Sequence, residues 1–214
     1  MTLLEKNIQY LIAINPGLPE VNEGSSIKEL RQFAEQCNQS LENLMFFNLR
    51  VTDLPFQQLR FIFLDVDGVL TEGGMFYTEE KTEFKRFDTK DGMAIKEAMK
   101  HGIEFGIISS GVNEAIIRHR ADMFGIKHVY VGAEPKLKVA TKWLDALEME
   151  WSNVGYIGDD INDLGMFEQA EIAACPSDAT LPIKNAADLV LESKGGFGCV
   201  REFVRCIPQL KTIL

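Results

Sequence analysis

The stretch FIFLDVDGVLT, residues 61–71, decides the fold of this chain. It opens with a continuous apolar run, as expected for a strand that is buried on both faces of a sheet. Asp65 and Asp67 follow directly, and residues two apart in an extended chain project to the same side. Gly68 then permits a sharp departure of the chain. The stretch therefore predicts a buried strand that ends in two converging carboxylates.

Similar apolar runs alternate with helical patterns from residue 60 onward. Further strands are predicted at residues 102–108, 127–131, 154–157, 172–174 and 188–191, and helices at residues 91–100, 113–124 and 135–148. The stretch 70–87 interrupts this alternation, and its glycine pair and polar centre predict a β-hairpin. Strands that alternate with helices indicate an α/β fold with a doubly wound parallel sheet and right-handed crossovers.

Residues 1–59 follow a different pattern. Ser26 and Glu29 match a capping box, and apolar residues then recur at steps of three and four from Ile27 to Met45. This periodicity predicts one amphipathic helix of roughly five turns. We interpret residues 1–59 as a helical N-terminal extension and residues 60–214 as a separate α/β domain.

Composition narrows the class of protein. The 214-residue chain carries a formal net charge of −10, which argues against a large nucleic-acid-binding face. Its four cysteines form no C-x-x-C pair and are too few for a disulfide scaffold, so we expect reduced thiols. No stretch has the pattern of a signal peptide or the apolar length of a membrane span. We therefore expect a cytoplasmic protein that binds neither nucleic acid nor membrane.

The two acids of the opening stretch indicate a metal site. Adjacent carboxylates raise each other's pKa unless a cation lies between them. Mg²⁺ is the usual hard cation at phosphate-binding sites. Taken alone, an Asp-x-Asp-Gly turn with solvated acids explains the motif equally well.

A second acidic cluster, GDDIND at residues 158–163, follows the strand predicted at residues 154–157. In a doubly wound sheet the carboxyl ends of the strands share one edge, where ligands bind. The two clusters are therefore expected to meet, which favours a metal site over two unrelated turns.

Two weaker signals point to phosphate binding. Ser109-Ser110-Gly111 lies between a strand and a helix, where a hydroxyl and free N–H groups can hold an anion, although a simple N-cap is the commoner role. Lys136 lies at the start of the helix 135–148, where a cation opposes the helix dipole. Phosphate neutralisation explains that position, and a solvated surface lysine is the alternative.

The order of these signals resembles the haloacid dehalogenase superfamily: Asp-x-Asp, then Ser or Thr, then Lys, then Gly-Asp-Asp-x-x-Asp, over about residues 60 to 206. The resemblance implies hydrolysis through an aspartyl-phosphate, with Asp65 as the nucleophile and Asp67 as the general acid and base. It also implies that Asp65, Asp67 and Asp159 bind Mg²⁺.

The same resemblance assigns the phosphate-binding residues. Ser110, Gly111 and Lys136, together with Asp67, would hold the transferring phosphoryl group, and Ser109 competes with Ser110 for the hydroxyl role. The supporting residues that it implies are Asp160, Asp163, Lys90 and Asp91.

The spacing of the motifs leaves no room for a large cap domain, which implies that a neighbouring subunit shields the site. The hairpin, residues 87–92 and the tail 195–202 resemble a capless branch of phosphatases acting on 3-deoxy-2-ulosonic acid phosphates. Their substrates are the eight-carbon octulosonate 8-phosphate and nine-carbon sialic-acid-like 9-phosphates. Members of this branch are typically homotetramers with packed hairpins, and there Arg201 would contact substrate or join a salt bridge near Glu202.

Two features depart from that branch. Val112 stands where the octulosonate enzymes usually carry Arg, so both the eight-carbon and the nine-carbon substrates remain open. Residues 1–59 lie outside the pattern altogether. We predict a Mg²⁺-dependent sugar-acid phosphatase. The alternatives from other classes are a receiver-like module phosphorylated on Asp and a non-catalytic relative that binds a sugar-nucleotide enzyme.

Overall fold

The computed structural model describes residues 2–46, 49, 51 and 54–213, and the chain forms two compact units, Met1–Leu54 and Pro55–Leu214. The larger unit starts slightly before residue 60, because the segment ahead of the first strand belongs to its core. Phe56 and Leu59 are buried there, and the ring of Phe56 packs edge-on against Phe203 at 5.2 Å between centroids.

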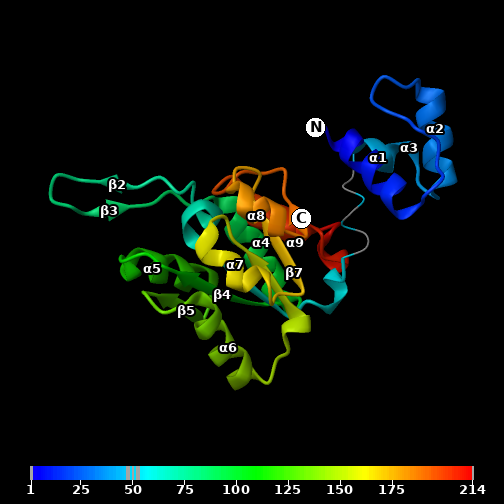
Figure 1. Ribbon diagram of the computed structural model, residues 1–214. Helices are drawn as coiled ribbons and strands as arrows, with labels where there is room; N and C mark the ends of the chain where they lie inside the picture. The colour runs from blue at the N-terminus through cyan, green and yellow to red at the C-terminus, as the bar shows by residue number, and fades with distance from the viewer. Residues whose placement is uncertain (1, 47–48, 50, 52–53, 214) are drawn as a thin grey trace. The chain divides into compact units, whose positions relative to one another are not determined.

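Within the described residues, the larger unit contains a six-stranded parallel sheet in the order β5-β4-β1-β6-β7-β8 (Figure 1). The strands are β1 (Phe61–Leu64), β4 (Glu104–Ser109), β5 (His128–Val131), β6 (Val154–Ile157), β7 (Ile172–Cys175) and β8 (Leu189–Val190). Leu64 of β1 pairs with Ile107 of β4 and Ile157 of β6, so the chain segments that follow these strands emerge along one edge. The doubly wound parallel sheet predicted from the sequence is confirmed.

Helices cover both faces of this sheet (Figure 1). They are α4 (Thr89–Lys100), α5 (Glu114–Phe124), α6 (Lys136–Leu147), α7 (Leu164–Phe167), α8 (Leu181–Ala186) and α9 (Cys199–Arg205). Helices α6, α7 and α8 pack with Phe63 and Tyr156 on one face. On the other face Phe203 of α9 lies against Gly155, and α9 packs against α4. None of the helices within the described residues is both long and apolar enough to cross a membrane.

A β-hairpin extends from the larger unit between β1 and α4 (Figure 1). Its strands β2 (Phe76–Tyr77) and β3 (Glu83–Phe84) are antiparallel. The rings of Phe76 and Phe84 stack on each other with centroids 5.4 Å apart, yet both side chains remain substantially exposed. The predicted hairpin is therefore present, and it carries apolar side chains that it does not bury itself.

The smaller unit has a helical core of its own. It contains α1 (Leu3–Ile14), α2 (Ile27–Gln36) and α3 (Leu41–Phe46). Its buried apolar residues are Ile8, Leu11, Leu30, Phe33, Ala34, Leu44 and Leu49. Buried Asn7 bonds two backbone groups, because its amide donates to the carbonyl of Leu44 at 2.9 Å and its carbonyl accepts the N–H of Leu49 at 2.9 Å.

The prediction of a single helix from Ile27 to Met45 is wrong, because the structure has two helices there, α2 and α3. Asn38 adopts a left-handed conformation with φ 54°, and the N–H of Gln39 reaches back to the carbonyl of Ala34 at 2.9 Å. This pattern terminates a helix. Ser40 then starts α3 by accepting the N–H of Asn43 at 3.0 Å. The apolar periodicity continues across the break and hides it.

Candidate active site

The candidate site lies at the carboxyl edge of the sheet, where three central strands end. Asp65 directly follows β1, Ser109 is the last residue of β4, and Asp159 comes shortly after β6. Lys136 begins α6, which follows β5. The parallel register of β4, β1 and β6 therefore brings together residues from distant parts of the sequence.

Asp65, Lys136 and Asp163 form the buried centre of this site. The Lys136 ammonium lies 2.8 Å from Asp65 Oδ1 and 2.5 Å from Asp163 Oδ1. All three side chains are at most 6% exposed. The lysine predicted at the start of a helix is thus a buried ion-pair partner of the predicted nucleophile, and not a solvated surface residue.

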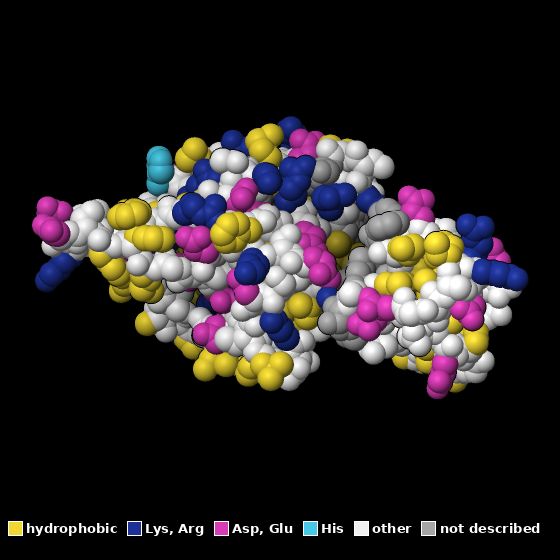
Figure 2. Space-filling model, turned by 90° about the horizontal axis from the view of Figure 1, so that it is seen from above, with side chains coloured by type: hydrophobic (Ala, Val, Ile, Leu, Met, Phe, Trp, Pro, Cys, Tyr) yellow, Lys and Arg dark blue, Asp and Glu magenta, His cyan; other side chains and the backbone are white. Residues whose placement is uncertain are grey.

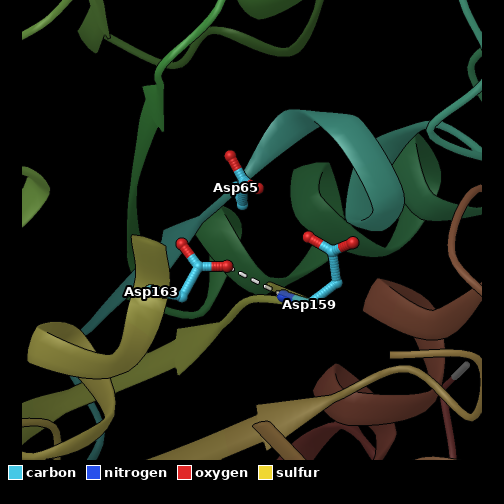
Figure 3. Close-up of side chains that lie close together, drawn as sticks. All are labelled: Asp65, Asp159 and Asp163. Carbon is cyan, nitrogen blue, oxygen red and sulfur yellow. Dashed lines mark hydrogen bonds between the residues drawn. The ribbon is translucent and has the colours of Figure 1, made fainter. Parts of the chain in front are cut away.

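Asp163 organises the loop that follows β6. Its Oδ1 also accepts the Tyr156 hydroxyl at 2.5 Å, while its Oδ2 accepts the backbone N–H groups of Asp159 at 2.8 Å and Asp160 at 3.3 Å. Figure 3 shows the Asp163–Asp159 bond and the common space that Asp65, Asp159 and Asp163 surround. Sequence reasoning missed Tyr156, although its place in a predicted buried strand implied that its hydroxyl had a polar partner.

Glycine is required where the loop after β1 meets Asp159. Gly68 has φ 88°, and a Cβ built there would lie 2.0 Å from Asp159 Oδ2. A side chain at this position would therefore both strain the backbone and displace the carboxylate. Glycine at this position therefore lets Asp159 approach residues 65–71, the segment after β1 that we call the β1 loop.

The electrostatics of this cluster favour a bound cation. Burial, together with the charge of Asp163, raises the pKa of Asp65 to about 6, although Lys136 opposes the rise. Burial and the charges of Asp65 and Asp163 raise the pKa of Asp159 to about 8. Burial disfavours the charged form of Lys136, but the two carboxylates outweigh it and raise the pKa. A single lysine thus leaves the three carboxylates incompletely compensated.

Carboxylate oxygens of Asp65, Asp159 and Asp163 lie within 4.8 Å of one another, which fits a hard cation such as Mg²⁺. Asp163 already accepts hydrogen bonds on both oxygens, so Asp65 and Asp159 offer the available ligand atoms. Asp67 is not in this group. Its Oδ1 contacts Lys85, and the sequence-based assignment of Asp67 as a third ligand stays a prediction.

Asp67 is bound by the hairpin. Lys85 donates to Asp67 Oδ1 at 2.6 Å and also pairs with Glu83 at 2.8 Å. The Thr71 hydroxyl lies 3.3 Å from the same Asp67 oxygen. Sequence reasoning missed Lys85 and Glu83, since neither belongs to a motif that carries chemistry.

The two candidate serines have different surroundings. Ser109 is buried, and its hydroxyl accepts the N–H of Gly111 at 3.0 Å. Ser110 is exposed, and its hydroxyl accepts the Asn162 amide at 3.4 Å. Ser109 is therefore engaged in shaping the loop, whereas Ser110 presents its hydroxyl at the surface of the site. The neighbouring Val112 side chain is 98% exposed.

The C-terminal tail, residues 195–202, lies against the β1 loop. A Cβ at Gly195 would approach the carbonyl oxygen of Gly68 to 1.9 Å, and the N–H of Gly196 donates to the carbonyl of Val69 at 2.8 Å. Buried Asp91 accepts the backbone N–H of Arg201 at 2.8 Å and so joins α4 to α9. Glycines at these positions allow the tail to contact the loop directly.

Arg201 and Lys90 each donate a backbone N–H to an aspartate carboxylate. Arg201 joins the tail network through its N–H, as described, and its neighbour Glu202 accepts the N–H groups of Glu192 and Ser193 at 2.8 Å each. The Lys90 side chain is exposed, and the Lys90 N–H donates to the helix-capping carboxylate of Asp88 at 2.7 Å. Glu202 therefore holds the segment that leads into the glycine-rich tail.

Comparison with known proteins decides the family. A family model described as haloacid dehalogenase-like hydrolase matches residues 129–202. The 3-deoxy-D-manno-octulosonate 8-phosphate phosphatase of Escherichia coli (strain K12) is 34% identical over 146 residues, which cover 68% of this chain and 77% of that protein. This chain belongs to the haloacid dehalogenase-like hydrolases.

Solved structures of hydrolases from this family share the fold. The 3-deoxy-D-manno-octulosonate 8-phosphate phosphatase of Moraxella catarrhalis, in complex with magnesium ion, phosphate ion and KDO, is 30% identical with a TM-score of 0.71. The match covers 77% of this chain and 91% of that one. The cobalt-bound Haemophilus influenzae enzyme is 32% identical with a TM-score of 0.69, over 73% and 91% of the two chains.

These matches confirm the predicted resemblance, the haloacid dehalogenase fold and the enzyme class. They give no support to the receiver-like alternative. The arrangement of Asp65, Lys136 and Asp159 at the sheet edge is consistent with hydrolysis by this family of enzymes.

Proposed function

We propose that this chain is a Mg²⁺-dependent phosphomonoester hydrolase that forms an aspartyl-phosphate on Asp65. The observation that carries the proposal is the buried Asp65 carboxylate, which Lys136 holds at 2.8 Å beside the carboxylate of Asp159. Metal-bound relatives and the incompletely compensated acids support Mg²⁺ as the cofactor. Asp65 and Asp159 would hold the ion, which when bound would neutralise charge on the phosphoryl oxygens.

The reaction has two steps. In the first, a carboxylate oxygen of Asp65 attacks phosphorus, the bond to the leaving oxygen breaks with its electron pair, and Asp67 gives that oxygen a proton. In the second, Asp67 takes a proton from water, whose oxygen attacks phosphorus and returns the electron pair to Asp65. Lys136 and the Ser110 hydroxyl would meet the charge on the transferring group.

We propose a 3-deoxy-2-ulosonic acid phosphate as the substrate. The matched relatives are named as phosphatases of the eight-carbon octulosonate 8-phosphate, which supports this class. The resemblance described above leads us to expect an arginine at position 112, where this chain presents the exposed apolar side chain of Val112, next to residues 109–111 that we expect to bind phosphate. The nine-carbon 9-phosphates therefore belong in the same proposal.

We further propose that the working form is a cytoplasmic homotetramer built around the hairpins. The hairpin exposes Met75, Phe76, Tyr77 and Phe84, with Met75 61% and Tyr77 57% exposed. Figure 2 displays hydrophobic side chains along this arm and charged ones at its tip. An isolated two-stranded hairpin is marginally stable in water, so packing against copies of itself would stabilise it. Residues 1–59 would form a separate extension.

The proposal is tested by phosphate release from a panel of phosphomonoesters with and without Mg²⁺. The panel contains octulosonate 8-phosphate, a sialic-acid-type 9-phosphate and unrelated sugar phosphates. We expect Mg²⁺-dependent turnover of an ulosonic acid phosphate and complete loss in Asp65→Asn, whose thermal stability should stay close to that of the original chain. Rapid turnover of unrelated esters alone would refute the substrate class, and an active Asp65→Asn variant would refute the nucleophile.

A further inference from the structure

Lys85 directly follows strand β3 of the hairpin, and its side chain contacts Asp67 in the candidate site. Its side chain is only 3% exposed, although the adjacent Phe84 of β3 is exposed. The ammonium contacts two acids, Asp67 Oδ1 at 2.6 Å and Glu83 Oε1 at 2.8 Å. A buried ammonium is retained only when its charge is compensated, and here both compensating groups are in place.

These contacts leave the two oxygens of Asp67 in different situations. Oδ1 receives Lys85 and has the Thr71 hydroxyl 3.3 Å away. Oδ2 lies near residues 109–111, which we expect to bind phosphate, since a Cβ built on Gly111 would lie 3.8 Å from it. One oxygen is therefore held by the hairpin, and the other is directed to the place where the phosphoryl group would lie.

We propose that Lys85 is a positioning residue for the reaction: it fixes Asp67 Oδ1 so that Oδ2 carries the proton to and from the reacting oxygens. Glu83 fixes Lys85 in turn, because it holds the same ammonium from two residues earlier in the same arm of the hairpin. The inference rests on the proposed function, since it concerns the proton transfers of Asp67. It makes the hairpin part of the catalytic apparatus in addition to any role in assembly.

The leaving group provides the means to test this role. A sugar alkoxide is a poor leaving group and requires the proton from Asp67 as the ester bond breaks. A p-nitrophenolate leaves without protonation. Misplacement of Asp67 should therefore slow cleavage of an alkyl phosphate far more than that of p-nitrophenyl phosphate, and kcat/KM reports this first step for both substrates.

The experiment compares Lys85→Met with the matched control Lys100→Met in the full-length protein with Mg²⁺. Lys100 is the last residue of α4, its side chain is exposed, and it forms an ion pair with Glu97 on the same helix. For Lys85→Met we expect kcat/KM to fall about 100-fold with the ulosonic acid phosphate, which is the lower end of the rate enhancement that general acid catalysis provides. With p-nitrophenyl phosphate we expect a fall of less than about 5-fold. Lys100→Met should leave both values unchanged.

Two further variants separate positioning from simple loss of structure. Glu83→Gln retains the Lys85–Asp67 contact and should produce a smaller change with the same preference for the alkyl substrate. Lys85→Arg should restore part of the lost alkyl activity, because a guanidinium can also bridge two carboxylates. Thermal unfolding of each variant would reveal a hairpin that no longer folds.

The outcomes distinguish this inference from the proposed function. An equal fall for both substrates in Lys85→Met, or no fall at all, would overturn the positioning role while the original chain remains an ulosonic acid phosphatase. If the original chain cleaves only other alkyl phosphates, the substrate class fails, but the same comparison with those esters still tests Lys85. Absence of turnover with every phosphomonoester would refute both.

Discussion

Replacing Asp163 with Asn removes a fully buried charge from the centre of the site without changing the shape of the side chain. The carboxylate binds four donors: Lys136, Tyr156 and the backbone N–H groups of Asp159 and Asp160. An amide can accept on its oxygen, but its NH₂ group would then face backbone N–H groups that also donate. We expect Asp163→Asn to destabilise the larger unit even though the substitution is isosteric.

The magnitude follows from what the variant leaves behind. Breaking a buried ion pair by removing one partner costs roughly 3–5 kcal/mol. Lys136 keeps Asp65 as a partner at 2.8 Å, and removal of the Asp163 charge relieves its repulsion of Asp65 and Asp159. We therefore expect a loss near the lower limit, about 3 kcal/mol at pH 7, or roughly 6–12 °C in Tm for a unit of this size.

Urea unfolding monitored by tryptophan fluorescence measures this loss in a buffer with EDTA. Trp143 and Trp151 both contact Phe63 in the larger unit, so their emission reports on that unit. Asp160→Asn is the matched control, because Asp160 is exposed and its side-chain oxygen caps the N–H of Ile161 at 2.8 Å, which an amide can also do. The control should change stability by no more than about 0.5 kcal/mol. A loss for Asp163→Asn no larger than that of the control would refute the assigned role of Asp163.

Three further predictions concern the tail, the buried acid of α4 and the metal. Gly195→Ala should lower the unfolding free energy by about 2 kcal/mol and turnover at least tenfold, because its Cβ would lie 1.9 Å from the carbonyl oxygen of Gly68. Gly165→Ala is the control, since a Cβ there has room and both quantities should stay unchanged. Burial raises the pKa of Asp91 from 3.8 to about 6, so its contribution to stability is fully present below pH 3.8 and is lost as the pH rises through 6. The unfolding free energy of Asp91→Asn, measured in urea relative to that of the original chain, should therefore rise by about 3 kcal/mol between pH 3.5 and pH 7.5. A difference between the two proteins that does not change with pH would contradict this. Mg²⁺ at a hundred times its Kd should raise the unfolding free energy by about 2.7 kcal/mol, and EDTA should reverse this increase. In Asp159→Asn, Mg²⁺ should produce no increase. If Mg²⁺ does not change the Tm of the original chain, the proposed ion is excluded.

The fold could be predicted from the sequence because its signals are local. A continuous apolar run such as Phe61 to Leu64 is buried on both faces of a parallel sheet whatever surrounds it, and Gly125 with φ 86° ends α5 where the pattern predicted. The break between α2 and α3 could not be predicted in this way. Both helices present apolar side chains to one core, so the periodicity continues through Asn38 and Ser40 although the backbone does not.

The site was predictable to the extent that its residues belong to spaced motifs at strand ends. Asp65, Lys136 and Asp159 meet because parallel strands share one carboxyl edge, a consequence of topology that the sequence pattern already contains. Spacing cannot state which way a side chain turns. The alternation of an extended chain would place Asp65 and Asp67 on one side with shared surroundings, but in the turn after β1 the two carboxylates take different partners, Lys136 for Asp65 and Lys85 for Asp67.

This difference in partners has a chemical consequence. A nucleophile and a proton-transfer group that shared one cation and one lysine would have to respond to the same charges, so each change in one would alter the other. In this chain Lys136 serves Asp65, whereas Lys85 serves Asp67 from a hairpin outside the sheet. Two acids two residues apart in the sequence are thus given separate electrostatic partners. This division explains why a second lysine is buried in the site, and it is the reason to expect that Lys85 variants affect proton transfer while the nucleophile keeps its own ion pair.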